Sequence, residues 1–262
     1  MKYFNNIENN NCVGQIYRSR NYGDFIITKY NNSRNIEIEF IETGYRKIVQ
    51  IGNIRCGEVK DCYLPSVYEV GVIGSRYLTH VRMNDGERTC RKEYMTWRGM
   101  LRRCYSEKKL LDSPTYIGCT VSENFKHYEY FYEWCNRQIG FNNEGWHLDK
   151  DLLVKGNKVY SEDTCVFLPE ELNILLVKRK SKRGDYPIGV HYCKSKKSFI
   201  SQINRNKGQQ DYLGKFNTPE EAFFAYKEAK EAFIKEQANK WKDKIDPRAY
   251  EALMTYEVDI ND

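Results

Sequence analysis

Three neighbouring segments near the middle of the chain contain residue types that can carry out chemistry on a phosphate ester. They are Trp146–Leu153, with one His and two Asp residues, the Gly-Asn loop Lys155–Lys158, and Thr164–Asn173. Their order predicts a strand, a loop, a second strand and a helix. Such a ββα unit can place an acid from the first strand and an Asn from the helix around one divalent cation, Mg²⁺ or Mn²⁺. The cation would stabilise the charge on the phosphoryl group and on the leaving oxygen.

This ββα order resembles the HNH, or His-Me finger, nucleases. The resemblance implies that Asp149 is the metal ligand on the first strand and that Asn173 is the ligand on the helix. It also implies that Asn157, in the loop, helps to orient the catalytic base. The family has a His directly after the first-strand ligand as that base, and this chain has Lys150 there.

Several groups could therefore activate the attacking water. Lys150 stands between Asp149 and Asp151, and the two acids favour its charged form over the neutral form that a base requires. His147 is expected on the same strand face as Asp149, where it could replace the base or be a partly buried structural histidine. Alternatively, Lys150 contacts the scissile phosphate as a cation and the metal alone activates water. Asp149 and Asn173 could also be a structural hydrogen-bonded pair.

Helices are expected before this unit. Tyr94–Tyr105 has apolar residues at helical spacing, and Tyr128–Ile139 has aromatic residues spaced to meet a core. We interpret these aromatic residues as packing groups and not as platforms for stacking bases. The arginines of the first helix lie away from its apolar face, and they are Arg98, Arg102 and Arg103.

The C-terminal stretch Tyr186–Trp241 predicts a three-stranded antiparallel sheet followed by one long helix. Thr218 and Glu221 predict a capping box at the start of that helix. Asp211 is the only acid in Tyr186–Asn217, so the sheet face away from the helix should carry a positive field suited to phosphates. An ordinary solvated face is the alternative.

The succession of GV, a basic turn, an aromatic-led strand, YLGKF, TPEEA and AY resembles the plant ethylene-response-factor type of DNA-binding domain, over about a fifth of the chain. The resemblance implies that the sheet lies in the major groove of DNA. That family is rich in Arg and Trp on its strands, whereas Lys, Ser and Asn dominate here, so we expect modest sequence selectivity. The candidate DNA-contacting residues are Lys194, Lys196, Lys197, Phe199, Ser201, Asn204, Arg205 and Lys215.

Together, the two modules resemble the HNH homing endonucleases of phages and mobile elements. The expected function is binding of double-stranded DNA, with metal-dependent phosphodiester cleavage. The alternatives are a catalytically degraded nuclease fold that acts as a DNA-binding or regulatory protein, and a factor that interacts with a host protein. A basic run ahead of the sheet is placed to neutralise DNA phosphates through Lys178, Arg179, Lys180, Lys182 and Arg183.

The chain has 262 residues and a net charge of +6, which is long enough for several modules with cores of their own. Its nine cysteines include no CxxC pair and favour reduced thiols. No apolar run is long enough to span a membrane and the first residues lack a signal-peptide core. We therefore expect a protein in the cytoplasm, that of the host cell if a phage encodes it.

The expected fold class is modular α+β. Alternation over Asp24–Phe40 predicts a β-hairpin in a small SH3-like barrel, with a structural or protein-docking role. Residues 242–262 are expected to fray. The expected divisions are a β barrel at 1–61, a linker at 62–90, an HNH-like domain at 91–177, a basic linker at 178–185, the sheet-plus-helix domain at 186–244 and a tail at 245–262.

Overall fold

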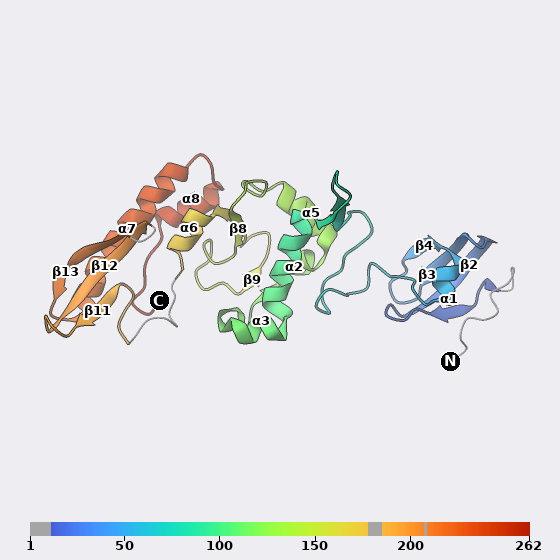
Figure 1. The fold of residues 1–262 in the computed structure, drawn as a ribbon, viewed down its shortest axis with the longest axis horizontal. Helices are drawn as coiled ribbons and strands as arrows, with labels where there is room; N and C mark the ends of the chain where they lie inside the picture. The colour runs from blue at the N-terminus through green and yellow to red at the C-terminus, as the bar shows by residue number, and fades with distance from the viewer. Residues whose placement is uncertain (1–11, 178–184, 207–208) are drawn as a thin grey trace. The chain divides into compact units, whose positions relative to one another are not determined.

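The computed structural model describes residues 12–177, 185–206 and 209–262 (Figure 1). The chain divides into two compact units. The first unit ends at Glu133 and the second begins at Trp134. Both contain helices and small sheets, which confirms the mixed α+β class. Over the described ranges, no helix has the length and apolar character needed to cross a membrane. The basic run Lys178–Arg183 lies outside the described residues.

A four-stranded antiparallel sheet forms the first part of the first unit. Its elements are β1 (Ile16–Arg18), β2 (Asp24–Asn32), β3 (Asn35–Phe40) and β4 (Arg46–Val49), followed by α1 (Ile51–Arg55). Alternate residues of β2 and β3 are buried in one core, including Phe25, Ile27, Ile36 and Ile38, which confirms the predicted hairpin. The predicted barrel is wrong. The strand order is β1-β2-β3-β4, and within the described residues the short edge strands do not pair to close the sheet.

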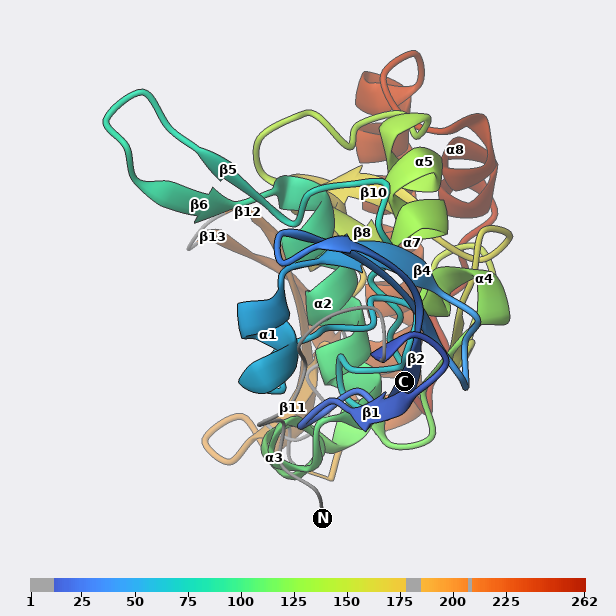
Figure 2. The same cartoon turned by 90° about the vertical axis from the view of Figure 1, so that its right-hand side faces the viewer.

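The segment expected to be a linker is packed against the helix α5 (Tyr128–Asn136). Glu129 lies on this helix, and its Oε1 accepts the backbone N–H groups of Ser75 and Arg76, each at 2.7 Å. The same segment continues into a hairpin that projects from the first unit (Figure 2). Its strands are β5 (His80–Arg82) and β6 (Arg88–Cys90).

The helix α2 (Lys92–Tyr105) confirms the helix predicted over Tyr94–Tyr105. Its predicted apolar face is buried, and the enclosed Trp97 donates through Nε1 to the carbonyl of Phe125 at 2.7 Å. The second predicted helix is confirmed as α5 but ends earlier than expected. The other elements of this region are α3 (Glu107–Asp112), the 3₁₀ helix η2 (Pro114–Tyr116), β7 (Thr120–Val121) and α4 (Glu123–Lys126).

The second unit contains the predicted order of strand, loop, strand and helix. The elements are β8 (Trp146–Asp149), β9 (Val159–Tyr160) in the long connection, β10 (Val166–Pro169) and α6 (Glu170–Leu175). β8 and β10 pair antiparallel, with Asp149 opposite Val166. β10 is buried over its whole length and leads directly into α6, whose Leu172 shares a core with Val166 and Leu168.

The predicted C-terminal sheet and helix are also present. The elements are β11 (Val190–Cys193), β12 (Ser198–Asn206), β13 (Gln209–Phe216) and α7 (Pro219–Trp241). The strands form an antiparallel meander in chain order. Thr218 Oγ1 accepts the N–H of Glu221 at 3.2 Å, and the Glu221 carboxylate accepts the N–H of Thr218 at 3.3 Å. This reciprocal pair confirms the predicted capping box.

α7 belongs to two hydrophobic cores. Its first half buries Phe223 and Tyr226 in a core with Ile203 of the sheet. Its second half buries Ile234 and Ala238 in the core that contains β10 and α6. One helix therefore joins the sheet module to the ββα unit, and the two are not separate domains connected only by a linker.

The C-terminal segment is folded, so the prediction that residues 242–262 fray is wrong. The helix α8 (Pro247–Met254) buries Ala249 and Leu253 in the core shared by β10, α6 and α7. Beyond it, the buried Val258 donates its N–H to Glu231 Oε1 at 2.8 Å. Ala249 and Leu253 are four residues apart on one helical face, a spacing that indicated a packed helix despite the acidic composition.

Candidate functional site

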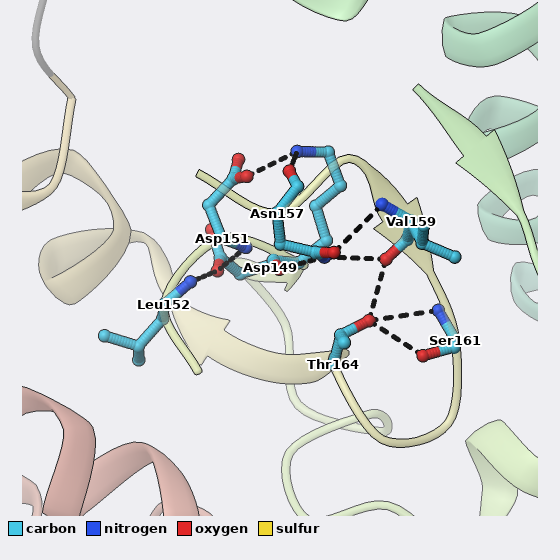
Figure 3. A network of polar contacts seen from close by, with 8 residues as sticks. Asp149, Asp151, Leu152, Asn157, Val159, Ser161 and Thr164 are labelled. Carbon is cyan, nitrogen blue, oxygen red and sulfur yellow. Dashed lines mark hydrogen bonds and ion pairs between the residues drawn. The ribbon is translucent and has the colours of Figure 1, made fainter. Parts of the chain in front are cut away.

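Asp149 lies at the end of β8, where its carboxylate organises the turn that follows. Its Oδ1 accepts the backbone N–H of Asp151 at 2.9 Å and that of Leu152 at 2.8 Å (Figure 3). Burial raises the pKa of the Asp149 carboxyl above its ordinary value, and the N–H donors act in the opposite direction. The turn therefore holds a half-buried carboxylate in a fixed orientation, at a place where its negative charge is poorly solvated.

Lys150, at the position that the resemblance assigns to the base, is buried, and its ammonium group already has partners within the protein. Only 5% of its surface is exposed. Its Nζ donates to the carbonyl of Asn157 at 2.8 Å and forms an ion pair with the Asp151 carboxylate. The ammonium also lies 5.6 Å from the centre of the Tyr160 ring. These partners hold the cation inside its own loop and favour a structural role over proton transfer or phosphate contact.

Asn157 ties the loop to the end of β8. Its Nδ2 donates to the carbonyl of Lys150 at 2.8 Å and to that of Val159 at 2.7 Å, and its Oδ1 accepts the N–H of Val159 at 3.0 Å. Thr164 Oγ1 donates to the same Val159 carbonyl at 2.7 Å (Figure 3). All three of these Asn157 side-chain hydrogen bonds are made to backbone groups, so this side chain fixes the path of the loop around Lys150.

His147 and Asn173 complete the predicted set. His147 is exposed on β8, opposite Leu168, and strand alternation places it on the same face as Asp149. Asn173 is half-buried on α6. The structure thus brings His147, Asp149, Lys150 and Asn157 into one strand and its loop, with Asn173 on the helix that follows the paired strand.

The donor chemistry of Asp149 and Asn173 suits a hard cation. A carboxylate and an amide oxygen are ligands of the kind that Mg²⁺ takes, and Mg²⁺ usually keeps several waters beside one or two protein groups. Across the described residues, no group of three His, Cys, Asp or Glu side chains is placed to hold a metal ion. A cation bound to the Asp149 carboxylate would therefore depend on water and on phosphate oxygens for most of its ligands.

The C-terminal sheet separates the predicted DNA-contacting residues into two sets. Ile203 packs in a core with α7, so by strand alternation Ser201 also faces the helix. The register of β12 is irregular between Asn204 and Asn206, so alternation does not place Arg205. Ser201 is fully buried. The Arg205 guanidinium pairs with Asp211 at 2.9 Å and lies 5.6 Å from the centre of the Phe233 ring on α7. The prediction that Ser201 contacts DNA is therefore wrong in this structure, because its side chain is buried. Arg205 is exposed and paired with Asp211, and its DNA contact stays a prediction.

Phe199 is half-buried within an aromatic group. Its ring centre lies 5.3 Å from that of Tyr186 and 5.2 Å from that of Tyr192. These contacts give Phe199 a packing role at the start of β12, and its predicted DNA contact would require the group to rearrange.

The other predicted residues remain exposed. Asn204 and Lys215 lie on the sheet face away from α7, and the three turn lysines precede β12.

The structure adds two exposed residues that were not predicted from the sequence. Tyr212 is 59% exposed opposite Gln202, with the Lys196 ammonium 5.6 Å from its ring centre, and His191 is exposed on β11. The alternation of inward and outward side chains along each strand could have identified Tyr212 and His191 from the sequence. The exposed set is His191, Lys194, Lys196, Lys197, Asn204, Arg205, Tyr212 and Lys215, of which Arg205 is paired with Asp211.

Comparison with known proteins adds no functional information. No protein-family model matches the chain, no curated protein matches it, and no solved structure matches it. The function must therefore be inferred from the residues and contacts of the chain itself.

Proposed function

We propose that the chain binds double-stranded DNA through the β11–β13 sheet. The observation that carries this proposal is the distribution of charge over the two faces. Lys215 lies on the exposed face and Lys194, Lys196 and Lys197 lie in the adjoining turn, whereas Asp211, the only acid of the strands, is paired with Arg205, which contacts the Phe233 ring of α7. An exposed positive face attracts phosphates, and a ribbon of β-strands fits into the major groove.

The exposed polar side chains support a modest ability to distinguish sequences. Asn204 offers an amide that can contact adenine, and Tyr212 offers a ring and a hydroxyl. The cations are lysines, which act as point charges and lack the bidentate fork of arginine. Affinity for the backbone should therefore exceed discrimination between bases.

The test is a titration of labelled duplex DNA with the full chain, read by fluorescence anisotropy at several salt concentrations. The variant replaces Lys194, Lys196, Lys197 and Lys215 by Gln. If each lysine neutralises one phosphate, the slope of log K against log salt should become shallower by about 3.6.

The matched control replaces four exposed lysines of the helical region, Lys235, Lys240, Lys242 and Lys244, by Gln. It changes the net charge equally and should leave most of the slope in place. Equal losses in the two variants would show that binding follows net charge alone and would contradict a role for the sheet face.

As a second candidate function, we propose that the ββα unit cleaves phosphodiester bonds. The supporting observation is the arrangement on β8, where two backbone N–H groups fix the half-buried Asp149 carboxylate and the exposed His147 lies two residues before it. Asp149 and Asn173 would hold Mg²⁺, which supplies charge stabilisation at a phosphoryl group when bound. The exposed imidazole of His147 is available to accept a proton from water, whereas Lys150 is occupied by its loop partners.

An inactive ββα scaffold is the alternative, and the contacts of Lys150 favour it. The Lys150 ammonium stabilises the loop at the position where the HNH nucleases, which the sequence resembles, have their base. A scaffold of this kind would retain DNA binding by the sheet without hydrolysis.

Nicking of supercoiled plasmid in Mg²⁺ distinguishes the two. An active unit should lose nicking in Asp149→Asn and in His147→Gln, while Asp243→Asn, an exposed acid elsewhere in the second unit, retains it. Lys150→His should not increase nicking, because it removes the ammonium that closes the loop. Absence of nicking in the wild type, with DNA binding intact, would establish the scaffold.

A further inference from the structure

The helix α2 carries arginines that folding of the chain does not explain. Arg98 and Arg102 are both exposed and lie one helical turn apart. Like charges at this spacing destabilise a helix. No acidic side chain of the described residues forms an ion pair with either one. Their charge is thus left available for a partner outside the chain.

Neighbouring cations extend this charge onto α3 and η2. The Arg103 guanidinium and the Lys109 ammonium lie 6.0 Å and 5.9 Å from the centre of the Tyr116 ring. Lys108 is exposed beside them. The segment Arg91–Gly118 holds seven basic and three acidic residues, and one of the acids, Glu93, is buried. The other two acids, Glu107 and Asp112, are exposed on α3 and offset part of this charge, so the exposed side of α2 and α3 keeps a net positive charge that is concentrated on α2.

We propose that this α2–α3 face is a second contact with double-stranded DNA, made to the phosphate backbone. The inference rests on the proposed DNA binding by the C-terminal sheet. A guanidinium matches phosphate oxygens with two parallel hydrogen bonds. Arg98 and Arg102 are separated by roughly 6 Å along the helix axis, and backbone phosphates repeat about every 3.4 Å along the duplex, so long side chains can reach neighbouring phosphates.

A second contact in the first unit changes how the chain binds. Once the sheet in the second unit holds DNA, engagement of α2 is intramolecular and takes place at a raised effective concentration. Phosphate contacts carry no sequence information, so α2 should add affinity and salt dependence without altering base preference.

The experiment measures binding of one labelled duplex by the wild type and by the double variant Arg98→Gln, Arg102→Gln over a salt series. The variant should bind about ten to a hundred times more weakly at low salt, with a slope of log K against log salt shallower by about 1.8. A second variant, Arg98→Lys with Arg102→Lys, keeps the charge and should retain the slope while losing some affinity.

The matched control is Arg18→Gln with Arg46→Gln, two exposed arginines of the N-terminal sheet that pair with Asp24 and Glu39. It should leave the slope unchanged. Circular dichroism melts of every variant separate lost binding from lost structure, and the lysine variant keeps the test valid if the glutamine variant unfolds.

Three results would overturn the inference. If the wild type binds but the glutamine variant has the wild-type slope, only the α2 contact is wrong. If the wild type binds no duplex at any salt concentration, the proposed function fails and the inference fails with it. If the α2 arginines are required for binding vesicles of phosphatidylserine and not for binding duplex, the face belongs to a membrane surface.

Discussion

The ββα loop and the C-terminal sheet use lysine in opposite ways. In the loop, Lys150 is buried and its ammonium is satisfied by a carbonyl, a carboxylate and an aromatic ring. In the C-terminal module, Lys196 in the turn before β12 and Lys215 on β13 are exposed, and the one acid of the strands is paired with Arg205. The difference teaches that the charge of a lysine is available to a partner outside the chain only where the fold leaves that charge without an acidic neighbour.

The largest expected effect is a loss of stability on removing the buried lysine. Lys150→Met leaves the carbonyl of Asn157 and the Asp151 carboxylate without their cation, and the free energy of unfolding should fall by about 2 to 4 kcal/mol. Lys196→Met, on the exposed turn, should change it by no more than about 0.5 kcal/mol. Urea denaturation of both variants measures the contrast, and equal effects would break the comparison.

A third kind of lysine sharpens the comparison. Lys230 is half-buried on α7, and burial lowers its pKa to about 8, from an ordinary value of 10.5. The unfolded chain then binds more protons between these two values, so the free energy of unfolding should rise as the pH increases from about 8 toward 10.5.

Lys230→Met should accordingly stabilise the protein at pH 7 by about 1 to 2 kcal/mol. The advantage over wild type should shrink above the lowered pKa of Lys230. Thermal melts of both proteins across this pH range check the sign. A constant difference at every pH would show that Lys230 is solvated.

The smallest expected effect concerns the face of the sheet. Ser201 Oγ is buried with no hydrogen-bond partner in the described structure, so Ser201→Ala removes an unsatisfied group. The free energy of unfolding should stay constant or rise by up to about 1 kcal/mol, and affinity for duplex DNA should not change. A clear loss of affinity in the anisotropy titration would place Ser201 on the DNA side.

Much of the local structure follows from short-range signals. The capping box of Thr218 and Glu221 and the apolar spacing in α2 were sufficient to predict both helices, because they depend on residues within one or two turns. The strand order of the ββα unit and of the C-terminal meander was predictable for the same reason.

Long-range packing was not predictable from those signals. Closure of the N-terminal sheet depends on whether distant edge strands meet, and the burial of Ala249 and Leu253 depends on a core built from β10, α6 and α7. The roles of Lys150 and Arg205 depend on partners that the fold supplies, Asn157 for one and Phe233 for the other. The sequence shows that both residues are charged. Only their contacts in the folded protein show whether a charge stabilises the fold or is free to bind a partner.

The sharing of α7 between two cores makes this helix a spacer. Phe223 and Ile234 mark its contacts with the sheet core and the ββα core, and they are separated by roughly 16 Å along the helix axis. If the sheet binds DNA as proposed, helix geometry sets the offset between the base pairs that contact the sheet and a phosphate near the Asp149 loop. Extra residues inserted in the 178–184 connection should leave that offset unchanged, whereas a register shift within α7 would alter it.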